Sequence, residues 1–267
     1  MKNLILIFFL LISNITFSQE LYINSEPASL IPKGSKVVSL VNSNIFLNGV
    51  DGLDNGEGTA TLLTPSLSYG ISKRLMLRVS LQFANNPLVD YYPNWRFNGF
   101  KFYSKQRILS SDRPKYHTRL SSFITGSYHN DKFMKNNLDI DIQDSGLQFG
   151  LIGTQLVNKF AISITSGLGF YTKEDLNVFM NSFSLGYLVL PRKYKSYKQT
   201  NFNVYLEYKT NTILNNSFPD RYYKFSSTIA PGIQFILFSR SRLDFSYKIR
   251  KANTPDEFLV KLTYIIY

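Results

Sequence analysis

The stretch SRSRLDFSYKIRK, residues 239–251, alternates strictly between apolar and polar side chains. Its apolar members are Leu243, Phe245, Tyr247 and Ile249, and polar or charged residues stand between them. In an extended strand successive side chains point to opposite faces, so this segment has one apolar face and one hydrophilic face. The apolar face of such a strand meets either a protein core or lipid, and the rest of the chain has to distinguish the two.

The chain begins with the features of a secretory signal peptide. In MKNLILIFFLLISNITFSQ one lysine precedes an apolar run from Leu4 to Ile12, and small residues follow it. The alternative is a membrane anchor helix, which needs roughly 20 apolar residues, and this run is shorter. We therefore predict export, with residues 1–18 removed and a mature chain that starts at Gln19.

The composition excludes several classes of protein. The 267 residues contain no cysteine, which excludes a disulfide framework, a thiolate metal site and a lipid attached through cysteine. The formal net charge of +12 suits anionic partners, such as outer-membrane lipid, lipopolysaccharide or a small anionic solute. Export argues against a nucleic-acid partner, and no basic cluster with interleaved aromatic residues resembles a nucleic-acid module.

Alternation with period two divides the mature chain into about twelve strands in a single domain. We expect these strands near residues 35–45, 59–70, 74–84, 95–107, 115–128, 145–156, 159–171, 180–190, 200–210, 222–237, 241–251 and 256–266.

The connections between these strands alternate in length. The odd-numbered ones, at 48–58, 84–94, 130–144 and 210–220, are long, and the even-numbered ones at 71–73, 157–158 and 238–240 are very short. The connections at 191–199 and 252–256 depart from the rule. Alternating long and short connections are typical of an up-and-down antiparallel barrel in an outer membrane.

A soluble barrel and a membrane barrel have the same alternation with opposite faces outward. The predicted strands have about 10 to 13 residues, long enough to cross hydrocarbon when tilted. The strand number is even, and small residues at 146–150 and 182–186 suit a crowded lumen. The terminal Tyr267 agrees with insertion by the barrel-assembly machinery. We therefore predict an all-β, up-and-down transmembrane barrel over residues 35–267, with a soluble secreted β-protein as the alternative.

Four stretches carry a resemblance to a known family. They are EPASLIPKGS at 26–35, GLQFGLIGTQLVNKFAIS at 146–163, GYLVLPRKYKSYKQTNFNVYLEY at 186–208 and APGIQFILFSRSRLDFSY at 230–247. They resemble one family of uncharacterised outer-membrane β-barrel proteins from Bacteroidota, which are sometimes described as transporters. The resemblance implies a single barrel domain in the outer membrane, and it implies no substrate and no functional residues.

Catalytic and metal-binding patterns are weak in this sequence. The two histidines are His117 and His129, and Ser121 lies about 13 Å from His117 on an extended strand, too far for a nucleophile and its base. The acidic loops at 51–58 and 136–144 lack the spacing of a calcium-binding EF-hand. We expect no enzyme activity, no cofactor and no metal site, and a lipid-modifying barrel enzyme is the least favoured function.

The hydrophilic strand faces supply the candidate functional residues. Under the membrane interpretation they line the lumen, and most of them are cations: Arg78, Lys101, Lys105, Arg107, Arg119, Glu207, Lys209, Asp244, Lys248 and Arg250. An excess of fixed positive charge in an aqueous path favours anions. The expected function is passage or binding of a small, anionic solute, and a non-conducting structural or partner-binding envelope barrel is the alternative.

The segment before the first strand, residues 19–34, lacks clean alternation. We expect it to lie in the periplasm across the mouth of the barrel, or to enter the lumen as a partial plug. In the second case Glu20 and Glu26 are candidate partners for lumenal cations.

Overall fold

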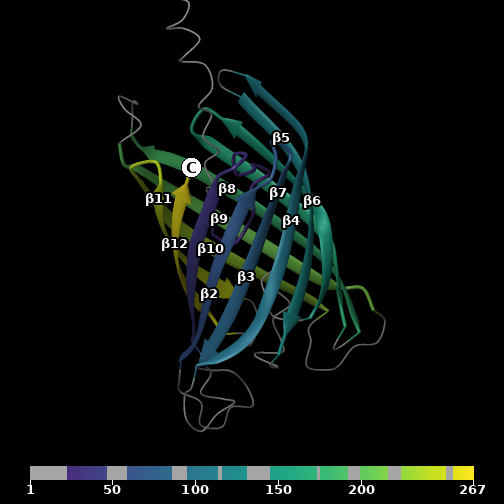
Figure 1. The fold of residues 1–267 in the computed structure, drawn as a ribbon. Helices are drawn as coiled ribbons and strands as arrows, with labels where there is room; N and C mark the ends of the chain where they lie inside the picture. Colours follow the sequence, from purple (N-terminus) through teal and green to yellow (C-terminus); the bar gives the residue numbers. More distant parts are fainter. Residues whose placement is uncertain are drawn as a thin grey trace, which may run out of the picture.

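Twelve antiparallel strands form a closed barrel (Figure 1). The computed structural model describes residues 23–46, 59–85, 95–113, 116–130, 145–172, 175–191, 199–215, 224–250 and 255–267. The strands are β1 (Lys36–Phe46), β2 (Thr59–Gly70), β3 (Leu75–Asn85), β4 (Arg96–Arg113), β5 (Tyr116–His129), β6 (Gly146–Val157), β7 (Phe160–Tyr171), β8 (Leu176–Leu190), β9 (Asn201–Ile213), β10 (Phe225–Leu237), β11 (Ser241–Arg250) and β12 (Glu257–Ile266).

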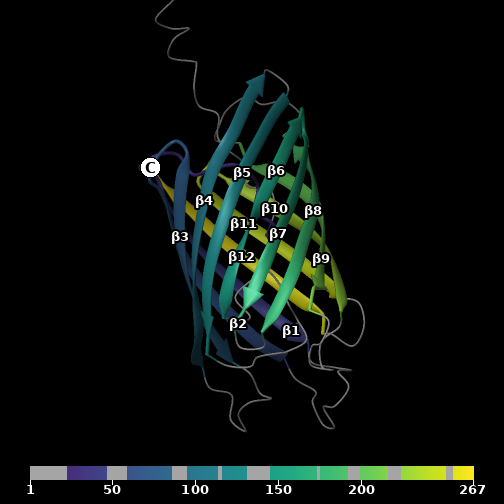
Figure 2. The ribbon, with the colours of Figure 1, turned by 90° about the vertical axis from the view of Figure 1, so that its right-hand side faces the viewer.

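The predicted fold class is confirmed. Every strand pairs with its neighbours in sequence, and β1 closes the barrel on β12 with Lys36 opposite Ile266 and Ile45 opposite Glu257. The strands are tilted, so the near and far walls cross in projection (Figure 2). No helix in the described part of the chain could span a membrane. The predicted signal peptide, residues 1–18, and the acidic loops at 51–58 and 136–144 fall outside the described residues.

The two ends of the barrel differ in their connections, and they are called the turn end and the loop end. The turn end carries the short β2–β3, β6–β7 and β10–β11 connections, the start of β1 and the C-terminus, and it is uppermost in Figure 1. The loop end carries the connections after β1, β3, β5, β7, β9 and β11. The β4–β5 hairpin projects furthest at the turn end (Figure 1).

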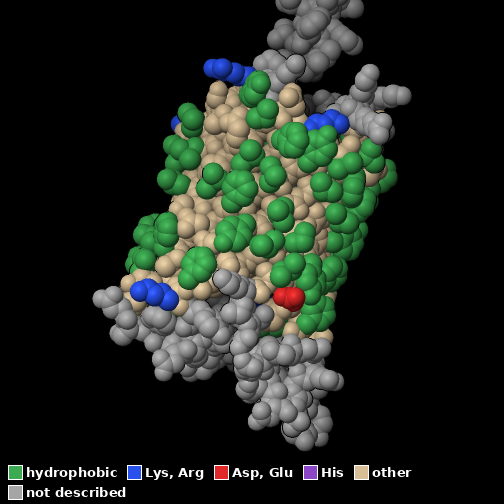
Figure 3. Space-filling model, turned by 180° about the vertical axis from the view of Figure 1, so that it is seen from behind, with side chains coloured by type: hydrophobic (Ala, Val, Ile, Leu, Met, Phe, Trp, Pro, Cys, Tyr) green, Lys and Arg blue, Asp and Glu red, His purple; other side chains and the backbone are tan. Residues whose placement is uncertain are grey.

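Large apolar side chains cover the outside of the wall. Near the middle of their strands, Val79, Leu151 and Leu206 are 47%, 50% and 48% exposed. In the view of Figure 3 hydrophobic side chains spread over the height of the wall, whereas charged ones lie near its two ends. The inward faces carry buried polar groups, among them Asn203 and Gln234. This arrangement is the reverse of a soluble barrel, so we infer that the outer face meets lipid.

Strand β11 shows the two faces within one element. Asp244, Ser246 and Lys248 are buried on the lumen side, whereas Tyr247 and Ile249 are exposed on the outside. Over β11, the alternation of the sequence therefore corresponds to one face toward the lumen and one face on the outer surface.

Small residues on the inner wall make room for aromatic rings. Gly150 of β6 lies opposite Gly167 of β7. A Cβ at Gly150 would lie 2.9 Å from the ring of Phe123 on β5, and one at Gly167 would lie 3.2 Å from it. The ring of Tyr205 likewise covers Gly232. The inner face is crowded because neighbouring strands fill the space that these glycines leave.

Candidate functional site

The chain enters the lumen at the turn end, through residues 23–35, called here the N-terminal segment. The N–H of Gly34 donates to the carbonyl oxygen of Gly70 at 2.8 Å, and the φ angle of Gly34 is +83°, in the region that favours glycine. A Cβ at Gly70 would lie 2.1 Å from the carbonyl oxygen of Pro32. Two glycines therefore allow the segment to turn closely against β2.

The middle of the N-terminal segment is hydrogen-bonded to β5 and β6. The N–H of Ala28 donates to Thr154 Oγ1 at 2.8 Å, and Ser121 Oγ donates to the carbonyl oxygen of Ala28 at 2.6 Å. Arg119 donates to Ser29 Oγ at 2.7 Å. The two bonds to Ala28 satisfy backbone groups that would otherwise be buried without partners.

The start of the N-terminal segment reaches the opposite wall, where it meets Glu207 of β9. The backbone N–H of Ser25 donates to Glu207 Oε1 at 2.6 Å, and Asn24 donates to Oε2 from its backbone at 3.1 Å and its side chain at 2.7 Å. The hydroxyls of Ser25 and Ser182 lie 2.7 Å apart. Because Glu207 is fully buried, these charge-assisted bonds compensate for the loss of its hydration.

Glu26 lies among cations of the barrel wall. It forms an ion pair with Arg78 of β3, and its Oε2 lies 3.3 Å from Lys105 Nζ of β4. The fully buried Lys105 also donates to the carbonyl oxygen of Pro27 at 2.8 Å. Burial raises the pKa of Glu26, but the charges of Arg78, Lys105 and Lys261 outweigh burial, and the net pKa lies well below its usual range.

Apolar packing also holds the N-terminal segment. Leu30 and Ile31 are buried in one hydrophobic cluster with Met76, Tyr103 and Ile152, which point inward from β3, β4 and β6. A lumen filled only with water would leave these inward apolar groups hydrated. The segment therefore completes a small core inside the barrel.

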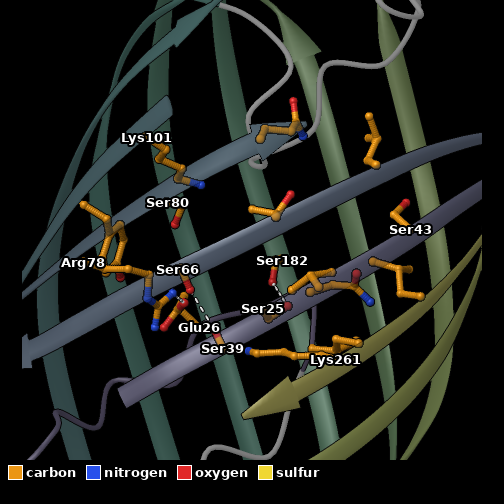
Figure 4. A pocket seen from close by; sticks show the side chains of 18 of the residues that line it. Ser25, Glu26, Ser39, Ser43, Ser66, Arg78, Ser80, Lys101, Ser182 and Lys261 are labelled. Carbon is orange, nitrogen blue, oxygen red and sulfur yellow. Dashed lines mark hydrogen bonds and ion pairs between the residues drawn. The ribbon is translucent and has the colours of Figure 1, made fainter. Parts of the chain in front are cut away.

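A cavity of about 140 Å³ lies beside the N-terminal segment, lined mainly by β1–β4 and β12 and by one residue each of β5, β6, β7 and β8. Figure 4 shows the side chains that converge on it, with Glu26 and Arg78 on one side and Lys101 and Lys261 directed toward it. Hydroxyl groups make up much of the remaining lining: Ser25, Ser39, Ser43, Thr64, Ser66, Ser80, Thr165 and Ser182. The cavity therefore combines positive charge with many hydrogen-bonding hydroxyls.

Two groups of this cavity have unused hydrogen-bonding capacity within the described part of the chain. The Lys261 side chain makes no hydrogen bond or ion pair with a described residue, although its charge acts on Glu26. The hydroxyl of Thr165 is buried and has no hydrogen-bond partner there. Both groups suit an anionic or polar ligand in the cavity.

A second ionic cluster lies toward the loop end. Glu257 forms ion pairs with Arg250 and with Lys248, whose Nζ lies 3.2 Å from Glu257 Oε2, and Ser43 donates a hydrogen bond to Glu257. Glu257 also borders the cavity, so it adds negative charge to that side of the lumen.

The structure separates the ten candidate lumen residues into groups. Arg78, Lys105, Arg119 and Glu207 bind the N-terminal segment, Lys101 lines the cavity, and Lys248 and Arg250 pair with Glu257. Asp244 accepts a hydrogen bond from Gln234 at 2.6 Å, Lys209 is buried on β9, and Arg107 is half-buried where β4 leaves β3.

Sequence reasoning missed Lys261 and Glu257 as site residues. Their signal was present, because both lie on the β12 face opposite the alternating apolar residues. Leu259 and Ile265 share that inward face and blur its polar pattern. Glu26 was a candidate partner of lumenal cations and contacts two of them, whereas Glu20 lies outside the described residues.

Comparison with known proteins places the fold. No protein-family model matches the chain, and no curated protein matches it in sequence. An outer-membrane channel from Pseudomonas putida F1 is 13% identical with a TM-score of 0.55, and the match covers 91% of this chain and 99% of the channel. The chain has the fold of an outer-membrane β-barrel. The KdgM porin shares this fold at 8% identity and a TM-score of 0.51, with 86% of this chain and 99% of the porin covered.

Proposed function

We propose that the protein passes small anionic solutes across the outer membrane through its lumen, and that passage requires the N-terminal segment to move. The observation that carries this proposal is the basic, hydroxyl-lined cavity, of which the segment forms a wall. The two solved structures compared above are a channel and a porin, which supports a role in solute passage.

The charge of the lining favours anions over cations. Lys101 and Lys261 point into the cavity, and Arg78 borders it. Fixed positive charge inside a low-dielectric wall concentrates anions and repels cations. Glu26 and Glu257 offset part of this charge, so displacement of the N-terminal segment makes the lumen more positive.

The cellular setting follows from the same proposal. Export by the signal peptide of residues 1–18, insertion by the barrel-assembly machinery and contact with lipopolysaccharide are the expected steps for a barrel with this apolar outer face. Residues 19–34 then act from the periplasmic side, because the N-terminal segment enters at the turn end. We also propose that the chain belongs to the family of Bacteroidota outer-membrane β-barrel proteins that its sequence resembles.

A non-conducting envelope barrel is the second candidate. The observation that favours it is the number of strands that the N-terminal segment contacts, from β3 and β4 through β5 and β6 to β8 and β9. The segment would then be a permanent part of the core.

We do not propose a lipid-modifying enzyme. Ser121 donates its hydroxyl to Ala28, His117 pairs with Asp112 at 2.8 Å, and the ring of His129 contacts Asn98 at 2.9 Å. None of these three contacts pairs a serine hydroxyl with an imidazole ring, which is the arrangement that a nucleophile and its base require. Purified barrel in detergent is expected to leave phospholipid intact.

Replacement of both Lys101 and Lys261 by glutamine tests the proposed anion preference. The double variant is expected to reduce the chloride-to-potassium permeability ratio by about threefold or more, because both charges border the path. The ratio comes from the reversal potential of planar bilayers that separate unequal salt concentrations.

Lys36→Gln is the matched control, because Lys36 is exposed at the turn end of β1 and should leave the ratio unchanged. Arg78, Lys105 and Arg119 are less suitable targets, since they also hold the N-terminal segment. A ratio that stays the same in the double variant would contradict an anion path along the cavity.

A further inference from the structure

Glu26 occupies a position where a solute anion would be bound if the N-terminal segment were absent. Its carboxylate is held by the wall cations Arg78 and Lys105, and Lys261 acts on it through the cavity. All of these cations belong to the barrel wall, whereas Glu26 belongs to the segment that must move. A cationic site that is fixed in the wall is therefore occupied by a carboxylate that can leave with the segment.

We propose that Arg78, Lys105 and Lys261 form a binding site for a small carboxylate ligand, and that Glu26 occupies this site as a tethered competitor. The inference rests on the proposed function, because it identifies the chemical class of solute and the contact that controls passage. A carboxylate ligand that reaches the cavity binds these cations in place of Glu26. The N-terminal segment then loses its ionic anchor.

The geometry favours a planar carboxylate with a short polar body. The Arg78 guanidinium and the Lys105 ammonium are already arranged around two carboxylate oxygens, one for each cation. The cavity beside them continues this site, and it supplies the Lys261 ammonium and the unpartnered hydroxyl of Thr165. A cavity of about 140 Å³ limits the ligand to a small molecule.

The strength of the competition depends on how often Glu26 leaves. When a site is free for only a fraction of the time, the apparent affinity for a ligand falls by that fraction. Removal of the negative charge of Glu26 should therefore raise the affinity for an external carboxylate without any change in the wall. The alternative, a purely structural ion pair, predicts no such gain.

The test measures acetate binding to the full mature chain in detergent, by the line width of carboxyl-labelled ¹³C-acetate in NMR titrations. Glu26→Gln is expected to tighten acetate binding about tenfold or more, because the competitor is gone. Acetamide, which is neutral and has the same shape, should not bind. Adding Lys261→Gln to Glu26→Gln should reverse most of the gain.

Glu207→Gln is the matched control. It removes the same charge from the lumen and weakens the other acidic anchor of the N-terminal segment, but it leaves Glu26 on its cations. We expect acetate affinity to stay within about twofold of the unmodified protein. An equal gain in Glu207→Gln and Glu26→Gln would overturn the proposal, since loosening or net charge would then explain both.

Folding of each variant is checked on denaturing gels, where the folded barrel of an unheated sample migrates differently from the unfolded chain of a heated sample. If Glu26→Gln does not fold, Glu26→Asp replaces it, because the shorter side chain withdraws the carboxylate and should produce a smaller gain. If acetate binds but no solute crosses the membrane, the binding site is supported and the proposed passage is contradicted. Flux without a gain in acetate binding would support passage and overturn this site.

Discussion

Deletion of residues 20–33 is expected to raise single-channel conductance in planar bilayers about tenfold or more, because the narrowest part of a path dominates its resistance. The N-terminal segment crosses the lumen from β2 at Gly34 and Gly70 to β9 at Glu207. Its removal takes Leu30 and Ile31 out of the lumen and removes the Glu26 carboxylate from Arg78 and Lys105.

The wall is expected to survive this deletion. The twelve strand pairs form their hydrogen bonds without the segment, and Gly34 and Ser35 remain to lead into β1. The check is the same heat-sensitive gel migration for the shortened and the complete chain. A correctly folded, shortened barrel whose conductance matches that of the complete chain would exclude the plug.

Leu151→Arg is expected to destabilise the inserted barrel by about 2–4 kcal/mol, because it places a charge on the lipid face near the midplane. Leu151 lies in the middle of β6 and is half exposed on the apolar outer surface. Reversible urea unfolding from lipid vesicles, followed by tryptophan fluorescence, measures the change in the free energy of unfolding.

Phe238→Arg is the control for this substitution. Phe238 is 72% exposed in the β10–β11 turn, at the end of the barrel, where a charge costs about 0–1 kcal/mol. Both variants replace an exposed apolar side chain by arginine. The difference between their free energies of unfolding therefore depends on how deep each residue lies in the membrane. Equal effects in the two variants would mean that the apolar surface does not meet hydrocarbon.

The strands of this barrel were largely predictable because burial differs between their two faces. In β11 the apolar residues at odd positions from 243 to 249 lie outside, and a one-residue shift would move all of them into the lumen. The predicted range 59–70 coincides with β2, and most other predicted ends agree with the structure within a few residues.

Two strands extend four or more residues beyond their predicted ranges, and each has a physical reason. β4 was expected to end at 107 but continues to Arg113, through a register shift between Arg107 and Leu109 and a polar, exposed tip that has no alternation. β8 begins at Leu176 instead of 180. Its first inward residues, Leu176, Val178 and Met180, are apolar and pack in a cluster, so the usual contrast between faces is lost there.

The candidate site was harder to predict than the wall. Alternation suggested which faces point inward, but it carried no information on which cations would contact the N-terminal segment. Arg78 and Lys101 looked equivalent in the sequence, and both line the cavity, yet it is Arg78 that forms an ion pair with Glu26. That difference depends on the path of residues 23–35, which have no periodic pattern.

A reversible disulfide provides the most direct test of passage controlled by the N-terminal segment. The chain contains no cysteine, and the hydroxyl oxygens of Ser25 and Ser182 lie 2.7 Å apart, so Ser25→Cys with Ser182→Cys places a single bond between segment and wall. The measurement is acetate flux into liposomes before and after reduction. The account predicts no flux from the oxidised barrel and measurable flux once the bond is reduced. Equal flux in both states, whether high or absent, would contradict it.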